Sequence, residues 1–340
     1  MRIFLSALLI VMMLSIACST ADATPTTEST ATTVTSKAIP TTVAPTPTTP
    51  AENLYKPIVS TATPTPTATP VAIVDALGQQ LSFETSPSRI VTLSPTATEM
   101  LYLVGGEAVG RDRASNYPEA AQGLPDVGSG YNPSVETLIG MKPDLVIIEA
   151  LTQARLAPTL AASGITVMAV KIESVEDIYE NVTIIGEVIG KQDAAATAIT
   201  SIKTRLSTIT GEDKSILMLI SDADQNLYAA KPESYTGLIA NVLGMENKAA
   251  GLPDAGPFPG FTSMTTEAIL IANPDVIVTI TPAPKPAPRL SESLRFIPPF
   301  AGLKAIQQNA VIEGDLALFL QAPGPRLVDA VEALKNGITG

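Results

Sequence analysis

The chain has 340 residues and carries 33 acidic and 21 basic side chains, which give a formal charge of −12 and a pI near 4.5. No cluster of Lys or Arg interrupts this acidity, so nucleic acid is not an expected partner. The chain has no histidine and a single cysteine. It therefore cannot build a Ser-His-Asp or Cys-His catalytic set, the usual zinc site or a histidine-ligated haem site.

Residues 1–17 have the features of a secretory signal peptide. Arg2 precedes an apolar run that ends at Ile16, and this run is too short for a stable membrane-spanning helix. The four residues ending at Cys18 resemble the lipidation motif of bacterial lipoproteins, although Ser15 occupies a position usually held by leucine. We expect acylation of Cys18, which would anchor the chain outside the cytoplasm, on the outer face of the cell membrane or in the periplasm.

Residues 18–70 change abruptly to Thr, Pro, Ala and Ser, as in the stretches 41–50 and 61–70. Such a composition has too few apolar residues to offset the entropy lost on ordering. We expect an extended, disordered tether that reaches on the order of 100 Å from a membrane. No later apolar run has the length of a membrane span, so the lipid would be the only membrane attachment.

From residue 71 onward, strands and helices are expected to alternate. Residues 72–83 predict a β-hairpin, and residues 89–93 predict a buried strand. Ser94-Pro95-Thr96 is typical of a helix start, and a glycine pair at 105–106 ends that helix. The further elements expected in this half are a strand over 108–110, a helix from Glu136, a strand to Ile148, a helix over 153–162 and a strand over 166–170. This alternation predicts a parallel sheet.

Two consecutive helices are predicted between residues 174 and 211. Ser174 caps the first, whose apolar residues recur at helical spacing up to Ile189. The second runs from Asp193 to about Thr210 and is roughly 27 Å long at about 1.5 Å per residue. We therefore expect an N-terminal lobe over 71–190, an interlobe helix over 191–211 and a C-terminal lobe over 212–340.

The most informative pattern is a repeated helix-to-strand unit. In each copy a glutamate opens a short apolar helix that ends at Pro-Asp and leads into a strand of branched aliphatic residues. The copies begin at Glu136 and Glu267 and turn at Pro143-Asp144 and Pro274-Asp275. Proline cannot continue a helix, and the run after it indicates a strand buried on both faces. A unit repeated in register predicts two similar α/β lobes.

The expected fold class is therefore α/β, with two lobes that each contain a central, mostly parallel sheet flanked by helices. One long, rigid helix bridges the lobes. The second lobe is expected to contain strands over 215–220, 276–278 and 311–313, a helix over 235–242 and a last helix to about residue 336. Ligands of open α/β sheets gather beyond the carboxyl ends of the strands, and clefts between domains favour small molecules. We expect the ligand between the lobes.

Segments 89–99, 128–136, 142–146 and 323–326 resemble the substrate-binding lipoproteins of ABC importers for cobalamin, ferric siderophores and haem, with the cobalamin-binding members as the nearest match. The likeness covers residues 71–336. It implies the helical-backbone periplasmic-binding fold, a monomer that is not an enzyme and holds no cofactor, and an ABC permease dimer with its ATPase as partner. In that family one glutamate of each lobe engages arginines of the two permease subunits. The resemblance gives those roles to Glu136 and Glu267.

The two glutamates also fit this role on physical grounds. Two similar lobes that each present a carboxylate are the geometric complement of a two-fold symmetric permease with a basic pocket on each subunit. A simpler role for each glutamate is a favourable charge at a helix N-terminus, worth about 0.3–1 kcal/mol. The equal register of Glu136 and Glu267 favours docking.

Aromatic residues form only 4% of the chain, so their positions matter. Flat rings suit a large macrocycle, and we expect ligand contacts from five aromatic residues predicted to lie in loops: Tyr117, Tyr131, Tyr228, Phe258 and Phe261. Thr96 and Thr98 begin a helix at the carboxyl end of a strand, where they either donate hydrogen bonds to the ligand or serve the helix cap. Arg326 either reaches the ligand or pairs with an acidic neighbour.

Among ligands, a corrinoid ranks first and a ferric siderophore second. Haem ranks third, since only tyrosine remains to ligate its iron. The chain departs from the cobalamin-binding members in having no tryptophan. Two other classes of protein stay open: a metal-independent enzyme that uses Asp222 and Asp224 as acid and base, and a surface adhesion module. The adhesion module accounts for the anchor and the tether but not for the paired glutamates.

Overall fold

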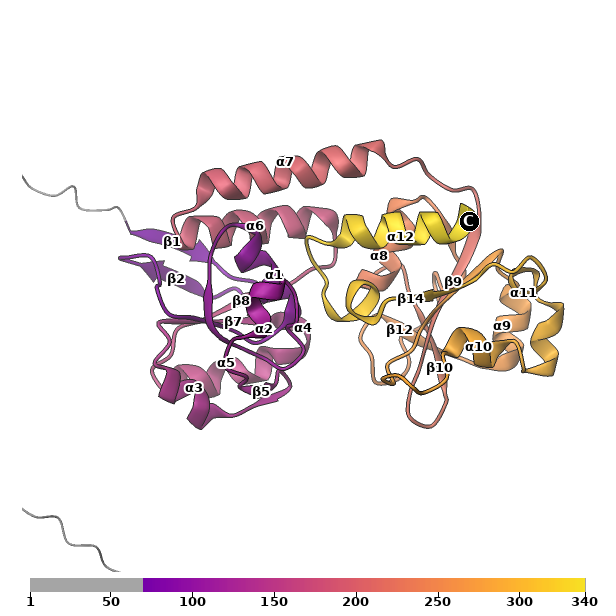
Figure 1. Ribbon diagram of the computed structural model, residues 1–340, viewed down its shortest axis with the longest axis horizontal. Helices are drawn as coiled ribbons and strands as arrows, with labels where there is room; N and C mark the ends of the chain where they lie inside the picture. Colours follow the sequence, from indigo (N-terminus) through magenta and orange to yellow (C-terminus); the bar gives the residue numbers. More distant parts are fainter. Residues whose placement is uncertain (1–69, 340) are drawn as a thin grey trace, which may run out of the picture. The chain divides into compact units, whose positions relative to one another are not determined.

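The computed structural model describes residues 70–339. The predicted signal peptide, Cys18 and the tether up to residue 69 lie outside the described residues. Within 70–339, no helix combines the length and the apolar composition that a membrane crossing requires. The two larger β-sheets come from separate parts of the sequence, one from strands before residue 171 and the other from strands after residue 214 (Figure 1).

The first sheet has four parallel strands. In spatial order they are β4 (Ala108–Arg111), β3 (Ile90–Thr92), β7 (Leu145–Glu149) and β8 (Val167–Val170). β7 is buried along its whole length, and its successive side chains point to opposite faces: Leu145 and Ile147 pack in one core cluster, Val146 and Ile148 in another. Burial on both faces explains the uninterrupted aliphatic run in the sequence.

A hairpin of β1 (Val71–Val74) and β2 (Gln80–Phe83) precedes this sheet, as predicted. One oxygen of the Asp75 carboxylate accepts hydrogen bonds from the backbone N–H groups of Leu77 (2.9 Å) and Gln79 (2.8 Å) and so closes the turn. The other oxygen accepts from the N–H of Ala169 in β8 (3.0 Å). The hairpin is thereby fixed to the edge of the first sheet.

α1 (Pro95–Leu103) begins where the sequence predicts. Ser94 accepts a hydrogen bond from the N–H of Ala97 at 3.1 Å, and Gly105 adopts a left-handed φ of 77° after the helix. The other elements of this half are α2 (Glu119–Gln122), β5 (Gly128–Ser129), β6 (Asn132–Pro133), α3 (Val135–Met141), α4 (Ala150–Gln153), a 3-10 turn (Ala154–Leu156) and α5 (Ala157–Ala162). The helix predicted over 153–162 is divided into this 3-10 turn and α5, and Pro158 lies in the first turn of α5, where its missing N–H costs no helical hydrogen bond.

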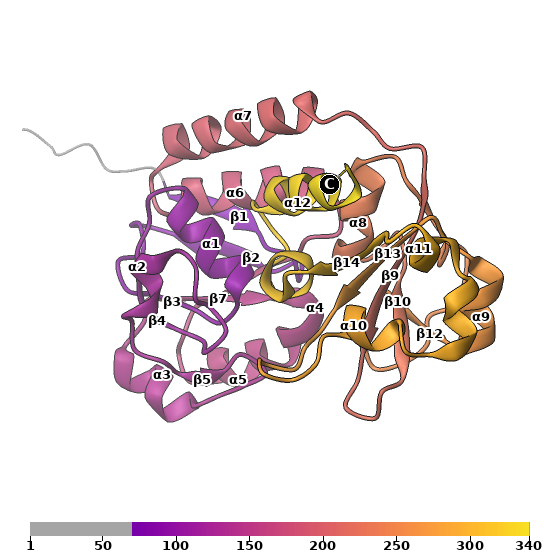
Figure 2. The same cartoon turned by 45° about the vertical axis from the view of Figure 1, so that its right-hand side comes forward.

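α6 (Val175–Val188) and α7 (Gln192–Thr208) pack side by side (Figure 2). A Cβ at Gly186 would lie only 2.6 Å from the Cβ of Ala195, so this glycine permits the close approach of the two helices. α7 has 17 residues and is about 26 Å long. It ends two residues before the predicted Thr210, and the chain then enters the second sheet.

The second sheet is mixed. Its strands in spatial order are β12 (Phe261–Met264), β10 (Leu227–Ala230), β9 (Ser215–Ser221), β13 (Val276–Ile280) and β14 (Val311–Gly314), and β11 (Glu246–Asn247) pairs with the start of β9. β9, β13 and β14 are parallel, whereas β10 and β12 run antiparallel to their neighbours. The loops predicted around Tyr228 and Phe261 are wrong, because a turn after β9 reverses the chain and pairs β10 back onto it.

Helices and turns surround this second sheet. They are α8 (Tyr235–Val242), α9 (Thr266–Ala272), α10 (Leu290–Leu294), a 3-10 turn (Pro298–Gly302), α11 (Lys304–Gln307), a π-helical turn (Ala317–Gln321) and α12 (Leu327–Thr339). α12 lies beside α7 in both views (Figures 1 and 2). Arg205 of α7 donates to Asp329 (2.7 Å) and Glu332 (2.8 Å) of α12. Because α7 also packs on α6, the interlobe helix is held by both halves of the fold.

Candidate functional site

Segments beyond the carboxyl ends of strands in the two sheets contact each other. α1 follows β3 of the first sheet, and residues 322–326 follow β14 of the second. Glu99 of α1 accepts hydrogen bonds from Nε of Arg326 (2.8 Å) and from one of its Nη atoms. A Cβ at Gly324 would lie 3.9 Å from the methyl carbon of Thr96. Because ligands of α/β sheets collect beyond the strands' carboxyl ends, we place the candidate site at this contact.

The Glu99–Arg326 ion pair is almost completely shielded from solvent. The side chain of Glu99 is 2% exposed and that of Arg326 is 17% exposed. Burial raises the pKa of the Glu99 carboxyl above its ordinary value, and the hydrogen bonds and charge of Arg326 offset only part of this. The ring of Tyr117 stacks on the guanidinium, with 4.2 Å between Cζ and the ring centroid. Of the two expectations for Arg326, pairing with an acidic neighbour is confirmed, and contact with a ligand stays a prediction.

The two threonines of α1 differ in their hydrogen bonding. The hydroxyl of Thr98 is fully buried and bonds Thr92 Oγ1 (2.7 Å), Ser115 Oγ (2.9 Å) and the carbonyl of Ser94 (3.0 Å), so it holds α1 in place. Thr96 is 1% exposed, and its hydroxyl has no hydrogen-bond partner among the described residues. A buried hydroxyl without a partner is unusual and costly. Thr98 therefore serves the fold, whereas the buried hydroxyl of Thr96 has no partner among residues 70–339. Ligand contact by either threonine stays a prediction.

Buried polar residues that the sequence analysis missed support the loops at the site. The amide nitrogen of Gln153 donates to the carbonyls of Leu93 (2.6 Å) and Gly130 (3.1 Å), which joins the ends of β3 and β7 to the loop before Tyr131. Asp112, after β4, accepts hydrogen bonds from Ser115 and the N–H of Ala114, and burial raises the pKa of its carboxyl. The sequence signal for Asp112 and Gln153 was a polar residue within about five positions of the end of a predicted strand.

The five aromatic residues predicted to contact the ligand fall into two groups. Tyr117 and Tyr131 lie in loops of the first lobe with 50% and 63% of their surface exposed. Tyr228 and Phe261 lie in β10 and β12 and are 7% and 4% exposed. Phe258 remains in the predicted loop and is partly buried.

Tyr228, Phe258 and Phe261 form one edge-to-face cluster. The ring centroids of Tyr228 and Phe258 are 5.5 Å apart, and those of Phe258 and Phe261 are 6.1 Å apart. The hydroxyl of Tyr228 donates to Asp222 at 2.9 Å. Because Tyr228 and Phe261 are buried, Phe258 is the member of the cluster best placed to meet a ligand.

Asp222 and Asp224 belong to a turn and do not form a catalytic pair. Asp222 accepts hydrogen bonds from the N–H groups of Asp224 (2.9 Å) and Asn226 (2.9 Å) and from the Asn226 side chain (2.8 Å). The hydrogen bond from the Asn226 side chain is the main reason why the pKa of Asp222 lies below its usual range. A carboxylate held in its ionised form in this way is a poor proton donor near neutral pH.

The repeated unit folds in the same way in both lobes. α3 and α9 each have seven residues, a Ser or Thr cap and an exposed glutamate as their second residue. Ser134 accepts from the N–H of Thr137, and Thr265 accepts from the N–H of Ala268. Each helix ends on a left-handed residue before Pro-Asp. Glu136 and Glu267 thus occupy equivalent, solvent-facing positions, as the register of the repeat predicts.

The aspartate of each Pro-Asp turn explains why the register is so regular. Asp144 accepts hydrogen bonds from the N–H (2.8 Å) and the hydroxyl (3.0 Å) of Ser88, and Asp275 accepts from the N–H (3.0 Å) and the hydroxyl (2.6 Å) of Ser215. Each aspartate thereby aligns the new strand with the strand beside it. These bonds lower the pKa of Asp275 to about 2.

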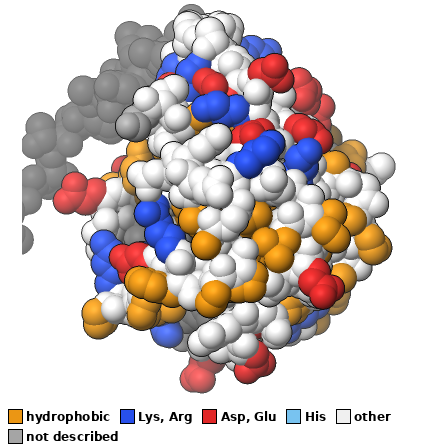
Figure 3. Space-filling view, turned by 90° about the vertical axis from the view of Figure 1, so that its right-hand side faces the viewer, with side chains coloured by type: hydrophobic (Ala, Val, Ile, Leu, Met, Phe, Trp, Pro, Cys, Tyr) orange, Lys and Arg blue, Asp and Glu red, His pale blue; other side chains and the backbone are white. Residues whose placement is uncertain are grey.

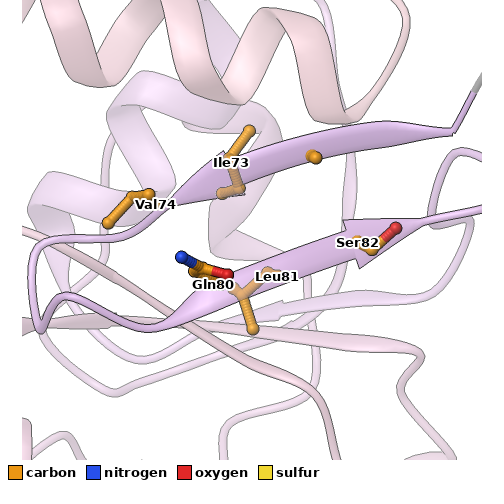
Figure 4. Close-up of a pocket in the computed structure, with 6 residues that line it drawn as sticks. Ile73, Val74, Gln80, Leu81 and Ser82 are labelled. Carbon is orange, nitrogen blue, oxygen red and sulfur yellow. The ribbon is translucent and has the colours of Figure 1, made fainter.

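A pocket of about 480 Å³ lies elsewhere, on the β1–β2 hairpin (Figure 4). The described residues that line it belong to these two strands: Ala72, Ile73, Val74, Gln80, Leu81 and Ser82. Its lining includes no charged group and none of the residues of the site described above. Among residues 70–339, no group of three or more acidic, Cys or His side chains is close enough to hold a metal ion.

Comparison with known proteins identifies the fold's relatives. A family model for periplasmic binding proteins matches residues 90–317. The chain belongs to the periplasmic binding protein family. The match extends from β3 of the first sheet to the π-helical turn before α12, so it includes both copies of the repeated unit.

Two related sequences agree with this family. YvrC of Bacillus subtilis, an uncharacterized ABC transporter substrate-binding lipoprotein, is 30% identical over 283 residues, which cover 79% of this periplasmic binding protein and 85% of YvrC. The cobalamin-binding protein of Halobacterium salinarum is 28% identical over 227 residues. That alignment covers 62% of this chain and 58% of the relative, which is less than two thirds of the relative's length.

Solved structures agree in the fold. The petrobactin-binding protein YclQ of Bacillus subtilis superposes with a TM-score of 0.70 and 18% identity, over 80% of this periplasmic binding protein and 99% of YclQ. The resemblance found in the sequence and the predicted fold class are therefore confirmed: the chain is a two-lobed α/β protein of the type that serves ABC importers as substrate-binding lipoprotein.

Proposed function

We propose that this chain is the extracytoplasmic substrate-binding component of an ABC importer and that it captures a corrinoid where the carboxyl ends of its two sheets meet. The observation that carries the choice of ligand is the charge at the site. Arg326 is neutralised by Glu99, and Arg111 donates to the carbonyls of Asp112 and Ala121. Arg155, in the neighbouring 3-10 turn, donates to the carbonyl of Tyr131. Arg326 thus has a counter-charge, whereas Arg111 and Arg155 keep a net positive charge, because backbone carbonyls are neutral.

The pairing of Arg326 with Glu99 favours a neutral ligand at the contact between the two sheets. Haem propionates and carboxylate siderophores carry negative charges, and burying them requires a cation that is free to pair with them. A corrin ring with neutral amide side chains requires apolar surfaces and a few hydrogen-bonding groups. Tyr117, Tyr131 and Phe258 supply the rings, and the unpartnered hydroxyl of Thr96 supplies a polar contact. The cobalamin-binding relative of Halobacterium salinarum supports the same ligand class.

Delivery of the ligand is assigned to the repeated helices. The exposed carboxylates of Glu136 and Glu267 would each meet a basic pocket on one subunit of the permease dimer. Acylated Cys18 and the segment up to residue 70 would hold the monomeric folded part near that permease at the outer face of the membrane. The protein needs no cofactor of its own for this role.

A ferric siderophore or haem is the second candidate. The exposed loop tyrosines favour it, because a tyrosine hydroxyl is a ligand for ferric iron. The tyrosines that would serve are Tyr117 and Tyr131.

Isothermal titration calorimetry with cyanocobalamin, a ferric siderophore and haemin tests the ligand class. We expect saturable 1:1 binding of cyanocobalamin with micromolar or tighter affinity and no turnover. Replacement of Tyr131 by Phe separates the candidates, because a stacking ring keeps its affinity whereas an iron ligand is lost. Tighter binding of haemin or of the siderophore, abolished by Tyr131→Phe, would reject the corrinoid.

A further inference from the structure

The proposed docking face of α9 carries a large exposed apolar side chain. Ile271 has 85% of its surface exposed and lies one helical turn after Glu267. Residues four positions apart lie on the same face of a helix. The inner face of α9 is already occupied, because Ile269 is fully buried. Any partner that engages Glu267 along α9 would therefore meet Ile271 as well.

The equivalent helix of the first lobe lacks this side chain. α3 and α9 match in length, cap and glutamate, and the position four residues after Glu136 is Gly140. A Cβ placed on Gly140 would have no atom within 4 Å, so a lack of room for a side chain is not the reason for glycine at this position. α3 exposes Ile139 to 48%, three positions after Glu136, whereas α9 exposes Ile271 to 85%. The two lobes thus present equal charges, and the apolar side chain beside the glutamate is more exposed on α9.

A second exposed apolar residue follows α10. Phe296 is 84% exposed and lies two residues before the 3-10 turn of Pro298–Gly302, which packs against α9. Figure 3 shows hydrophobic side chains spread over the lower half of this end of the molecule, with acidic and basic groups mainly above them. Single exposed apolar residues are common, whereas contiguous exposed apolar patches mark interaction surfaces.

We infer that Ile271 and Phe296 form, with Glu267, an acidic and apolar docking surface for the extracytoplasmic face of the permease, which would offer an apolar recess beside its cation. This inference rests on the proposed function, because the permease is the partner that Glu267 would engage. Burial of such side chains adds hydrophobic association to a charge pair. The C-terminal lobe therefore holds the permease more tightly than the N-terminal lobe.

The test measures binding of the protein to its partner permease–ATPase complex, in lipid nanodiscs, by biolayer interferometry. Ile271→Ala and Phe296→Ala should each weaken the affinity by about 10-fold. Gly140→Ile should strengthen it, because it gives α3 the side chain that α9 has. Val74→Ala is the matched control, since Val74 is 57% exposed on the distant β1 strand and its loss should change nothing.

The glutamates separate failure of this inference from failure of the proposed function. If Glu136→Ala and Glu267→Ala weaken binding while Ile271→Ala and Phe296→Ala behave like Val74→Ala, the apolar surface is refuted and docking stands. If the glutamate variants also bind normally, the docking role itself is wrong. Self-association of the protein that Ile271→Ala abolishes would assign the surface to a second copy and overturn the inference.

Discussion

Removal of Arg326 should destabilise the protein strongly, because it leaves the buried carboxylate of Glu99 without its counter-charge. The side chain of Glu99 is 2% exposed, and breaking such a pair from one side costs about 3–5 kcal/mol. Arg326 keeps 17% exposure, so water reaches part of the site, and we expect the lower end, about 3 kcal/mol, for Arg326→Ala. The loss of the Tyr117 stack is included in this value.

The stability lost in Arg326→Ala should depend on pH in a defined direction. Burial already raises the pKa of Glu99 above 4.5, and removal of Arg326 takes away the interactions that lower it. In the variant, the folded state then keeps a proton that the unfolded chain releases. Stability of the variant therefore falls as pH rises from the unfolded pKa towards the raised folded pKa, and it is constant above it. The difference in unfolding free energy between the native protein and Arg326→Ala should be small near pH 4 and reach its full value at pH 7.5.

Urea unfolding of four proteins at both pH values measures this: the native protein, Arg326→Ala, Glu99→Gln and the double variant. The double variant should be more stable than Arg326→Ala at pH 7.5, because it no longer buries an unpaired charge. The reasoning is refuted if Arg326→Ala loses less than about 1 kcal/mol at pH 7.5, which is the range for exposed pairs, or if its loss of stability is the same at pH 4.

Three further outcomes are expected. The double variant Glu136→Ala, Glu267→Ala should keep its ligand affinity but fail to stimulate the partner ATPase; parallel loss of ligand binding would contradict docking. Tyr131→Ala should weaken ligand binding by about 1–3 kcal/mol in calorimetry, and an unchanged affinity would assign the ring to packing. Asp275→Asn should lower the unfolding free energy by about 1 kcal/mol, a value reduced for partial exposure. Because the pKa of Asp275 is depressed to about 2, this difference should persist above pH 4 and disappear as pH falls to 2, and a difference that persists at pH 2 would contradict the assignment.

Local signals were sufficient to predict the repeated unit. Its helix stop, left-handed cap, Pro-Asp turn and buried strand all lie within about a dozen residues, and each is governed by backbone chemistry that a sequence displays. The start of α1 was predicted for the same reason, since Ser94 and Pro95 act on the adjacent turn. The equivalent positions of Glu136 and Glu267 follow from this local regularity.

Contacts between distant segments were not predictable in the same way. Glu99 and Arg326 are 227 positions apart, and only the charge of Glu99 between buried Thr98 and Met100 hinted at a partner. β10 and β12 were missed because antiparallel pairing depends on the turn before β10, while the aromatic content of Tyr228 and Phe261 suits strands and ligand loops alike. The pairing of β10 with β9 and β12, which the sequence does not display, makes these segments strands and not loops.

The connection between the aromatic segments and the docking helices has a mechanical consequence. Tyr131 precedes Glu136 by five positions through β6 and the Ser134 cap, and Phe258 precedes Glu267 by nine through β12 and the Thr265 cap. A permease that displaced α3 or α9 would therefore also displace the short segment before that helix. This segment begins at an aromatic residue that is a candidate for ligand contact. Docking to the permease would then itself weaken ligand binding, and release of the ligand would need no separate signal.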